Sequence, residues 1–491
     1  MAGISSKRNK LLHRFYEPLV LLYALDQFQG DQLYSDNNRP SLDDATEKEL
    51  RRRYLNSLSY ICDYKKGGDT VTAIGAAANP LRYYIASNKA PQRKVTDFLE
   101  SVFSKLEQVY NMNGEERIQM ESMLLKACVE FSEQRIRTYL RFLQLSMKEC
   151  AKAVQDKPVL ENFIRERVNT FTGHKKSESP FRAAKHYIGR IAAHVKNVKV
   201  LLAAAQRLPQ LVLKPEIIPI KNPPSIVLPA PRGSSLKLDS IANRMVPSSQ
   251  SQLLSELRSS LQTLDRLFSI ENTFRRAYLE KNPRARVHAE LIVLEYFYER
   301  SATLEHWDND RFIGCSKPAC YCCSLYFQEH PADVEPPSTH QRIYLNWLPP
   351  TNLPGVEDPS SRLATLEKKM LNAMVQRIRI RTIEQIRSQT GRRQKQYDST
   401  TGETYSTHTK AASMEKQLER IDTLPVAEGE NWIDAPSILV TRVADPENEY
   451  ANNDAEAGLI VSLENVHLSR QITESCEDSD DEQGVKLLGF V

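Results

Sequence analysis

The chain has 491 residues, enough for two or three domains, and its 66 basic and 62 acidic residues leave a formal net charge of only +4. This near balance excludes a strongly basic or acidic protein whose overall charge would by itself indicate a partner. The eight cysteines are too few and too uneven for a small secreted disulfide scaffold, and no run of about 18 apolar residues predicts a membrane span. The sequence therefore predicts an intracellular protein, cytoplasmic or nuclear, without membrane contact.

The first 207 residues are predicted to form a mainly α-helical region. Near its start, Leu12, Phe15 and Leu19 recur at the spacing of one helix face. Residues 208–252 differ, because seven prolines between positions 209 and 231 alternate with short apolar pairs. Since proline cannot donate a hydrogen bond to a sheet, this stretch is either a linker or a pair of edge strands. Its second half, 233–252, is polar and is predicted to be loose.

Residues 253–390 alternate between helix and strand patterns. The predicted elements are a helix at 253–279, a helix at 287–298 that is nearly apolar all round, a strand at 311–315, a helix at 318–329, a strand at 342–348 and a helix at 361–389. This order is typical of an α/β domain in which helices pack on a sheet. Residues 391–491 are polar, with an acidic run at 474–482, which predicts a largely disordered tail.

Four of the eight cysteines lie within nine residues, from Cys315 to Cys323, which indicates metal chemistry rather than disulfides. Cys320 and Cys323 are three residues apart at a predicted helix start, so both sulfurs can reach one ion. The helix N-terminus lowers thiol pKa values and helps to form the thiolates that zinc requires. Together with His288, at the start of the preceding helix, they predict a Zn²⁺ site with three protein ligands and a fourth position for water.

Glu290 lies two residues beyond His288, and at a helix entrance these two side chains can converge on one point. A carboxylate beside a zinc-activated water can accept its proton and return it to a ring nitrogen or a departing amine. Two thiolates and a neutral imidazole offset the charge of Zn²⁺. We therefore expect Glu290 to act in catalysis rather than as a ligand.

These motifs resemble those of a known enzyme superfamily. His288 and Glu290, followed by Cys320 and Cys323, are similar to the metal-binding and catalytic motifs of the cytidine deaminase-like superfamily. The wider stretch Ile-Gly-Cys-Ser-Lys-Pro-Ala-Cys-Tyr-Cys-Cys at 313–323 resembles one branch in particular. This branch comprises predicted nucleic-acid or nucleotide deaminases, is named after a rickettsial locus and is expanded in fungi.

The resemblance covers about residues 250–390 and implies a three-layer helix–sheet–helix domain. It also implies that His288, Cys320 and Cys323 hold zinc and that Glu290 is the proton shuttle. A zinc-activated hydroxide would then attack C4 of cytosine or C6 of adenine.

The sequence departs from the commonest superfamily pattern in two ways. Ala319 separates the proline from the first cysteine, and the strand pair expected before the histidine helix is not evident in 253–286. Residues 217–228 are the alternative source of this pair, through a longer connection. The stretches 60–64 and 67–70 also resemble fungal members of the branch.

A closed structural site is the alternative to a catalytic one, with Cys315 as a fourth ligand that excludes water. Otherwise we expect Cys315 and Cys322 to be small core residues or neighbours of the ligands. His306, His330 and His340 are expected at the surface, without metal contact.

Two basic stretches suggest a charged partner. The first comprises Arg165, Arg167, Lys175, Lys176, Arg182, Lys185, Arg190, Lys196, Lys199 and Arg207. Lysine and arginine displace counterions from phosphates, which predicts a face that binds RNA or single-stranded DNA, whereas a solvated helix face is the alternative. The second stretch, with Arg377, Arg379, Arg381 and Arg387 followed by a basic run at 391–395, allows the same two interpretations.

The sequence thus predicts hydrolytic deamination of a cytosine or adenine base, with a nucleic acid favoured over a free nucleotide. Tyr321 and Trp307 are candidates for stacking on the base, although packing is the expected role of Trp307. The main alternative is a catalytically silent deaminase fold in which structural zinc supports a protein- or RNA-binding module. A wholly structural zinc protein with an interaction role is a third possibility. The presence of Glu290 favours the enzyme.

Overall fold

A computed structural model describes residues 6–26, 41–78, 80–89, 91, 93–155, 180–228, 236–247, 249–279, 284–350 and 362–388. All of them belong to one compact unit, Met1–Ser406, while a second unit comprises Thr407–Val491. The predicted disordered tail at 391–491 therefore lies outside the described residues. Within the described ranges, no helix combines the length and the apolar character that a membrane span requires.

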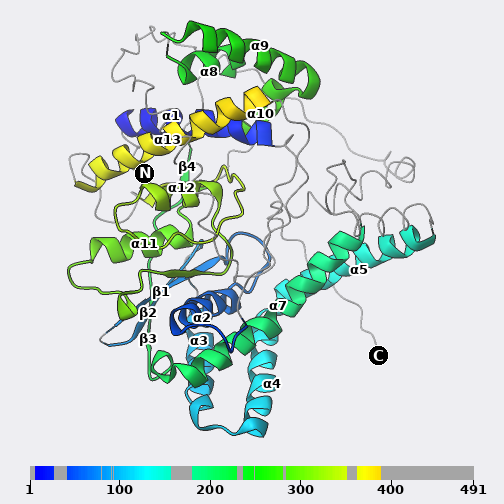
Figure 1. Ribbon diagram of the computed structural model, residues 1–491, viewed down its shortest axis with the longest axis vertical. Helices are drawn as coiled ribbons and strands as arrows, with labels where there is room; N and C mark the ends of the chain where they lie inside the picture. Colours follow the sequence, from blue (N-terminus) through cyan, green and yellow to red (C-terminus); the bar gives the residue numbers. More distant parts are fainter. Residues whose placement is uncertain are drawn as a thin grey trace, which may run out of the picture. The chain divides into compact units, whose positions relative to one another are not determined.

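The centre of the first unit is a four-stranded sheet with the order β3–β2–β1–β6 (Figure 1). Its strands are β1 (Thr72–Ala77), β2 (Arg82–Ser87), β3 (Glu216–Pro219) and β6 (Ile313–Cys315). β1 is antiparallel to both of its neighbours, with Ile74 opposite Ile85 of β2 and opposite Gly314 of β6. β2 and β3 are parallel. The strand predicted at 311–315 is thus present as β6.

Helices cover both faces of this sheet, α2 (Glu47–Cys62) on one face and α11 (Ala289–Glu299) on the other. Two glycines permit the close approach of these helices. A Cβ atom at Gly75 would lie 2.6 Å from the Phe297 ring of α11, and one at Gly314 would lie 2.4 Å from the Leu55 backbone of α2. The predicted α/β class, with a helix–sheet–helix arrangement, is confirmed.

The first two strands correct the expectation about the strand pair before the histidine helix. This pair is the β1–β2 hairpin from the N-terminal region, not residues 217–228, which contribute β3 at the sheet edge and the short β4 (Ile226–Val227). Every residue of β1 is buried, so its small apolar side chains show none of the alternation that marks a strand with one exposed face. The sheet therefore combines strands from both sides of residue 253. Part of the proline-rich stretch forms edge strands, one of its two predicted alternatives.

Three other expectations about secondary structure were wrong. The helix predicted at 253–279 is two helices, α9 (Ser251–Phe268) and α10 (Ile270–Leu279), because Ser269 between them is left-handed with φ 53°. The stretch expected to be loose contains α8 (Leu238–Met245), whose apolar face is buried. Residues 342–348 have buried residues at alternate positions but form only one bridge, between Trp347 and Arg286, because a turn at 345–346, with the Trp347 N–H 3.4 Å from the Tyr344 carbonyl, interrupts the extended backbone.

The remaining helices pack as two groups. Residues of α1 (Ser6–Asp26), α12 (Tyr321–Glu329) and α13 (Arg362–Ser388) share one hydrophobic cluster with α11, and α10 packs against α1. On the other side, α7 (Pro180–Arg207) packs against α2, and α3 (Arg93–Leu106), α4 (Gly114–Phe131) and α5 (Glu133–Gln155) pack against α7 (Figure 1). The helices predicted at 287–298, 318–329 and 361–389 are present as α11, α12 and α13. The starts of α11 and α12 carry the candidate site.

Candidate metal centre

The site begins at the first turn of α11. His288 is the N-cap residue of this helix, with φ −78° and ψ 151°, so its side chain projects from extended rather than helical backbone. The next backbone N–H, of Ala289, donates to Asn88 Oδ1 at 2.8 Å. This bond satisfies one of the N–H groups that a helix start leaves without an internal partner. Because Asn88 directly follows β2, it ties the end of the sheet to the start of the helix.

Cys320 occupies the corresponding position on α12. It is the N-cap residue, and its Sγ accepts a hydrogen bond from the backbone N–H of Cys323 at 3.5 Å. The preceding residue is held from both sides: the Ala319 N–H donates to the Ser338 carbonyl at 2.7 Å, and the Ala319 carbonyl accepts from the His340 N–H at 3.1 Å. Both sulfurs therefore lie at a helix N-terminus, where the local positive potential favours thiolates.

The two helix starts bring the predicted ligands together. His288 Nδ1 lies 3.6 Å from Cys320 Sγ and 3.4 Å from Cys323 Sγ. The three ligand atoms all lie within 4.8 Å of one another, and all three residues are buried. Among the residues that the structure describes, they are the one group of three or more His, Cys, Asp or Glu side chains with metal-binding geometry.

These three side chains shift one another's pKa values. Burial by itself would raise the pKa of Cys320, but hydrogen bonds from Cys323 and the charge of His288 outweigh it and hold that pKa well below its usual value. Burial alone would lower the pKa of His288, yet the neighbouring Cys320 raises it. Burial and the Cys320 charge raise the pKa of Cys323. The three donors thus already favour negative charge on one sulfur, which suits a cation.

Glu290 lies beside this group. It is the second residue of α11 and is only 6% exposed. Burial raises the pKa of its carboxyl group, and the charge of His288 opposes this shift. The carboxyl group also interacts with Cys323. In a regular helix, side chains two positions apart point in different directions. His288 is the N-cap with extended backbone, so its side chain and that of Glu290 can both point towards the same site.

The other two clustered cysteines are not members of the ligand group. Cys315 ends β6, and its thiol donates to the Ile313 carbonyl at 3.6 Å. Cys322 is fully buried. Neither belongs to the group of converging donors, which supports the three-ligand interpretation over the closed four-ligand one.

Cys315→Ser is therefore expected to keep its full zinc content. Serine is only slightly smaller than cysteine and can still donate to the Ile313 carbonyl, and no ligand is lost. Metal analysis of the purified variant by mass spectrometry measures the zinc content. Loss of zinc from this variant would instead indicate a closed site with four protein ligands.

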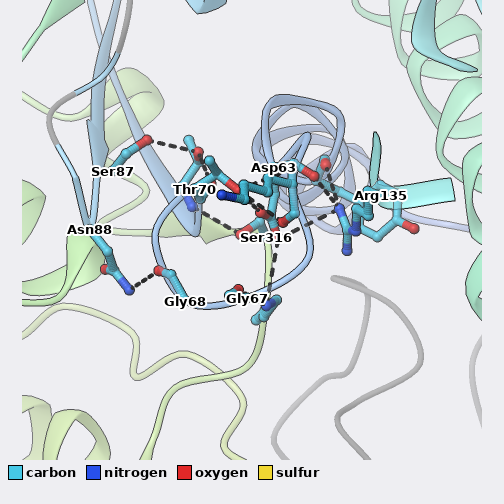
Figure 2. A network of polar contacts seen from close by, with 12 residues as sticks. Asp63, Gly67, Gly68, Thr70, Ser87, Asn88, Arg135 and Ser316 are labelled. Atoms are coloured by element: carbon cyan, nitrogen blue, oxygen red, sulfur yellow. Dashed lines mark hydrogen bonds and ion pairs between the residues drawn. The ribbon is translucent and has the colours of Figure 1, made fainter. Parts of the chain in front are cut away.

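The loop between α2 and β1 lies beside Asn88, the residue that bonds to the start of α11 (Figure 2). Asn88 Nδ2 donates to the Gly68 carbonyl at 2.7 Å, so this single amide side chain bonds both the loop and α11. Asp69 forms an ion pair with Arg286, which lies two residues before His288. Both contacts attach the loop within one or two residues of a candidate metal ligand.

The same loop is also tied to the segment before Cys320 (Figure 2). Lys317 Nζ donates to the carbonyl of Gly67 at 2.7 Å, and Gly67 has a φ of 120° that favours glycine. The loop begins at Asp63, which is fully buried and pairs with Arg135 of α5 at 3.5 Å. Sequence reasoning missed these roles, because no local pattern connects residues near 63–88 with motifs more than 200 positions later.

The nearby histidines differ in their surroundings. His330 was expected at the surface but is buried: its Nε2 lies 3.1 Å from Glu295 Oε1, and its Nδ1 accepts from the Ala332 N–H at 3.2 Å. Glu295, on the buried side of α11, explains this burial, because its carboxyl group gives the His330 imidazole a polar partner. His306 stacks on Phe297 with ring centroids 4.3 Å apart, and burial lowers its pKa to about 4. As expected, neither is part of the ligand group.

The two aromatic candidates for base stacking have other contacts. Trp307 packs against the hydrophobic cluster around α2, whereas both cysteine ligands belong to the cluster around α11. Tyr321 is only 3% exposed, and the guanidinium carbon of Arg381 lies 4.6 Å above its ring. These contacts favour packing as the role of both residues.

The first basic stretch is partly structural. Its first four residues lie outside the described part of the chain. Arg190 is buried, and Arg207 donates to backbone carbonyls just before α2. Lys185, Lys196 and Lys199 are exposed on α7, where spacings of 11 and 14 residues place them on one face. We call these three exposed lysines the lysine face. Within the described residues, this face is the remaining candidate for the predicted nucleic-acid surface.

The arginines of α13 are used mainly in internal contacts. Arg377 forms an ion pair with Glu329, and Arg387 Nη2 lies 2.8 Å from Glu256 Oε2. Burial lowers the pKa of Arg379 to about 10. These contacts favour the structural interpretation of this helix. The basic run at 391–395 lies outside the described residues.

Comparison with known families places this site in a wider context. Residues 287–351 match the model of the OTT_1508-like deaminase family. No match was found among curated proteins or among solved structures. The matched span contains the whole candidate ligand group and Glu290. Residues 287–351 therefore carry an OTT_1508-like deaminase segment, which confirms the resemblance to the deaminases named after a rickettsial locus.

Proposed function

We propose that this chain catalyses the zinc-dependent hydrolytic deamination of a cytosine or adenine base. The observation that supports this most strongly is the group of three buried donor atoms, from His288, Cys320 and Cys323, within 4.8 Å of one another. One imidazole and two thiols are a known donor set for catalytic zinc, which keeps its fourth position open. No fourth described His, Cys, Asp or Glu joins the group, so the residues fit such a site.

The chemistry divides between the metal and one carboxylate. Bound zinc would act as a Lewis acid that makes a water molecule more acidic and more nucleophilic. Glu290 would accept a proton from this water as its oxygen bonds to the base carbon, and would deliver that proton to the ring nitrogen. It would then move the second proton, from the hydroxyl group now on that carbon, to the departing amine. The exocyclic C–N bond breaks, ammonia leaves, and the base retains a keto oxygen.

The main rival is a catalytically silent fold with structural zinc. A buried carboxyl group that makes no structural contribution costs free energy, since its charged form loses hydration. Glu290 is buried at the ligand group, and burial raises its pKa. A structural site gains nothing evident from this group, whereas a deaminase needs it. Its position therefore supports catalysis.

Metal analysis combined with a substrate screen tests the proposal. The purified full-length chain is expected to hold about one zinc and to convert cytosine or adenine to its keto form in nucleosides, nucleotides, RNA or single-stranded DNA. Mass spectrometry of the products detects the conversion, and Glu290→Ala provides the background. A full zinc complement with all four substrate classes unchanged would favour the silent rival.

We further propose a nucleic acid as the substrate, because the lysine face of α7 suits phosphate contacts. Lys196 and Lys199 are both exposed, and Lys199 lies 3.9 Å from Glu121 at a surface where such a pair contributes little. If each lysine contacts one phosphate of a single strand, the double substitution Lys196→Glu/Lys199→Glu should reduce the slope of log affinity against log salt by about 1.4.

Fluorescence anisotropy with labelled RNA and single-stranded DNA across a salt series measures this effect. Lys368→Glu/Lys369→Glu is the matched control, because it makes the same charge change at two exposed lysines of α13. The control is expected to keep the wild-type slope. No binding by the wild type at low salt would exclude a polymer and favour a free nucleotide.

A further inference from the structure

The indole of Trp347 contacts one of the candidate metal ligands. Its Nε1 lies 3.2 Å from Cys323 Sγ, and both side chains are fully buried. A buried indole N–H needs an acceptor, because water cannot reach it. Nε1 is the donor in this contact, so the sulfur of Cys323 is its acceptor. The contact joins the segment 342–348, which follows α12, to the first turn of that helix.

Several elements hold this indole in place. The ring of Phe15, on α1, packs against it with centroids 5.2 Å apart, and Tyr16 donates from its hydroxyl group to the Trp347 carbonyl. The adjacent Asn346 carbonyl accepts from the Arg286 N–H at 2.8 Å, two residues before His288. The donor is thus positioned by the N-terminal helix and by the segment that leads to the other ligand.

We infer that Trp347 is a positioning residue for the metal site. Its indole N–H orients the sulfur of Cys323 and stabilises the negative charge of the thiolate when a metal is bound. A metal thiolate is a charged acceptor, and hydrogen bonds to charged groups are about twice as strong as neutral ones. Side chains that bond to metal ligands typically change metal affinity or activity by about 10–100-fold when replaced. Helix α1 contributes to this positioning, because its residues Phe15 and Tyr16 hold Trp347 in place.

This inference rests on the proposed function only in that the three donors bind a metal. Its test is therefore metal binding rather than turnover. Trp347→Phe keeps an aromatic ring in the core and removes the N–H. We expect this variant to bind Co²⁺ about 10–100-fold more weakly than the wild type in competition with a chelator of known affinity. We also expect the sulfur-to-cobalt charge-transfer band to move to longer wavelength, because the sulfur electrons lose a stabilising donor.

Two further variants separate this role from simple packing. Trp307→Phe makes the same substitution at a tryptophan packed in the other cluster and is expected to leave affinity and band unchanged. Benzothienylalanine at position 347 keeps the shape of the indole while a sulfur replaces the N–H group. It should reproduce the band shift of Trp347→Phe even if the smaller phenyl ring loosens the core.

The outcomes distinguish this inference from the proposed function. A wild-type chain that binds no Co²⁺ or zinc would overturn the metal site and the inference together. If the wild type binds metal, and Trp347→Phe and the benzothienylalanine protein both show the wild-type affinity and band, then only the role of Trp347 is overturned.

Discussion

Glu290→Gln is expected to lower the deamination rate at least a hundredfold while zinc and fold are retained. Glutamine has nearly the same size but cannot accept a proton from the attacking water. Positioned general acid–base catalysis contributes about 10²–10⁴-fold, and one carboxylate that serves several proton transfers contributes towards the upper end. Steady-state kinetics on the substrate found by screening measures the loss, which should lie in kcat with little change in substrate binding.

Glu295→Gln is the matched control for this variant. Glu295 lies on the same helix and is equally buried, at 5% exposure, but it bonds to Tyr326 at 2.6 Å and lies outside the ligand group. We expect its substitution to affect stability more than catalysis, with a rate within a few fold of wild type. Equal rates for wild type and Glu290→Gln would show that the proposed proton transfers do not pass through Glu290.

Cys320→Ser and Cys323→Ser are each expected to abolish zinc binding and to destabilise the unit. Each substitution removes a thiolate from a set of three donors, and the serine hydroxyl is not a comparable ligand for zinc. A metal present at about 1,000 times its dissociation constant stabilises the native state by about 4 kcal/mol, and this contribution disappears with the site. Metal analysis and thermal unfolding, with and without chelator, measure both effects.

Cys322→Ser is the control for these variants, because Cys322 lies between the two ligands in the same turn and is equally buried but is outside the ligand group. It is expected to keep zinc, although it is destabilised to some extent by a buried hydroxyl group. Chelator should lower the unfolding temperature of the wild type and of Cys322→Ser but not that of the ligand variants. Full zinc content in both ligand variants would disprove the assigned site.

The ligand set was predictable because its geometry is largely local. Cys320 and Cys323 are three residues apart at a helix start, and His288 caps the preceding helix. The N-cap position, which sets the direction of a side chain, depends on a few neighbouring residues. The site also requires the starts of α11 and α12 to lie close together. The order helix, strand, helix along the chain favours this, because both helices can then pack on the same sheet. The metal-binding role assigned to these residues remains a prediction.

The rest of the site depends on contacts between distant parts of the chain. Asn88 bonds to Ala289, and Trp347 is held by Phe15 and bonds to Cys323. None of these contacts leaves a periodic or spaced pattern in the sequence, because each partner lies in a separate element. The segment at 342–348 shows the same difficulty: a strand was predicted there, yet the chain turns at 345–346 and places Trp347 against Cys323.

By itself, the sequence determined the helices that carry His288, Glu290 and the two cysteines, together with the donor chemistry of the site. Only the tertiary structure decided which strands complete the sheet and which side chains support the donors. The physical reason is the difference between local and non-local interactions. Capping and helix periodicity act over a few residues and can be recognised in the sequence. The pairing of β1 with β6 joins residues more than 200 positions apart, and it is decided by burial of both faces of β1 between α2 and α11.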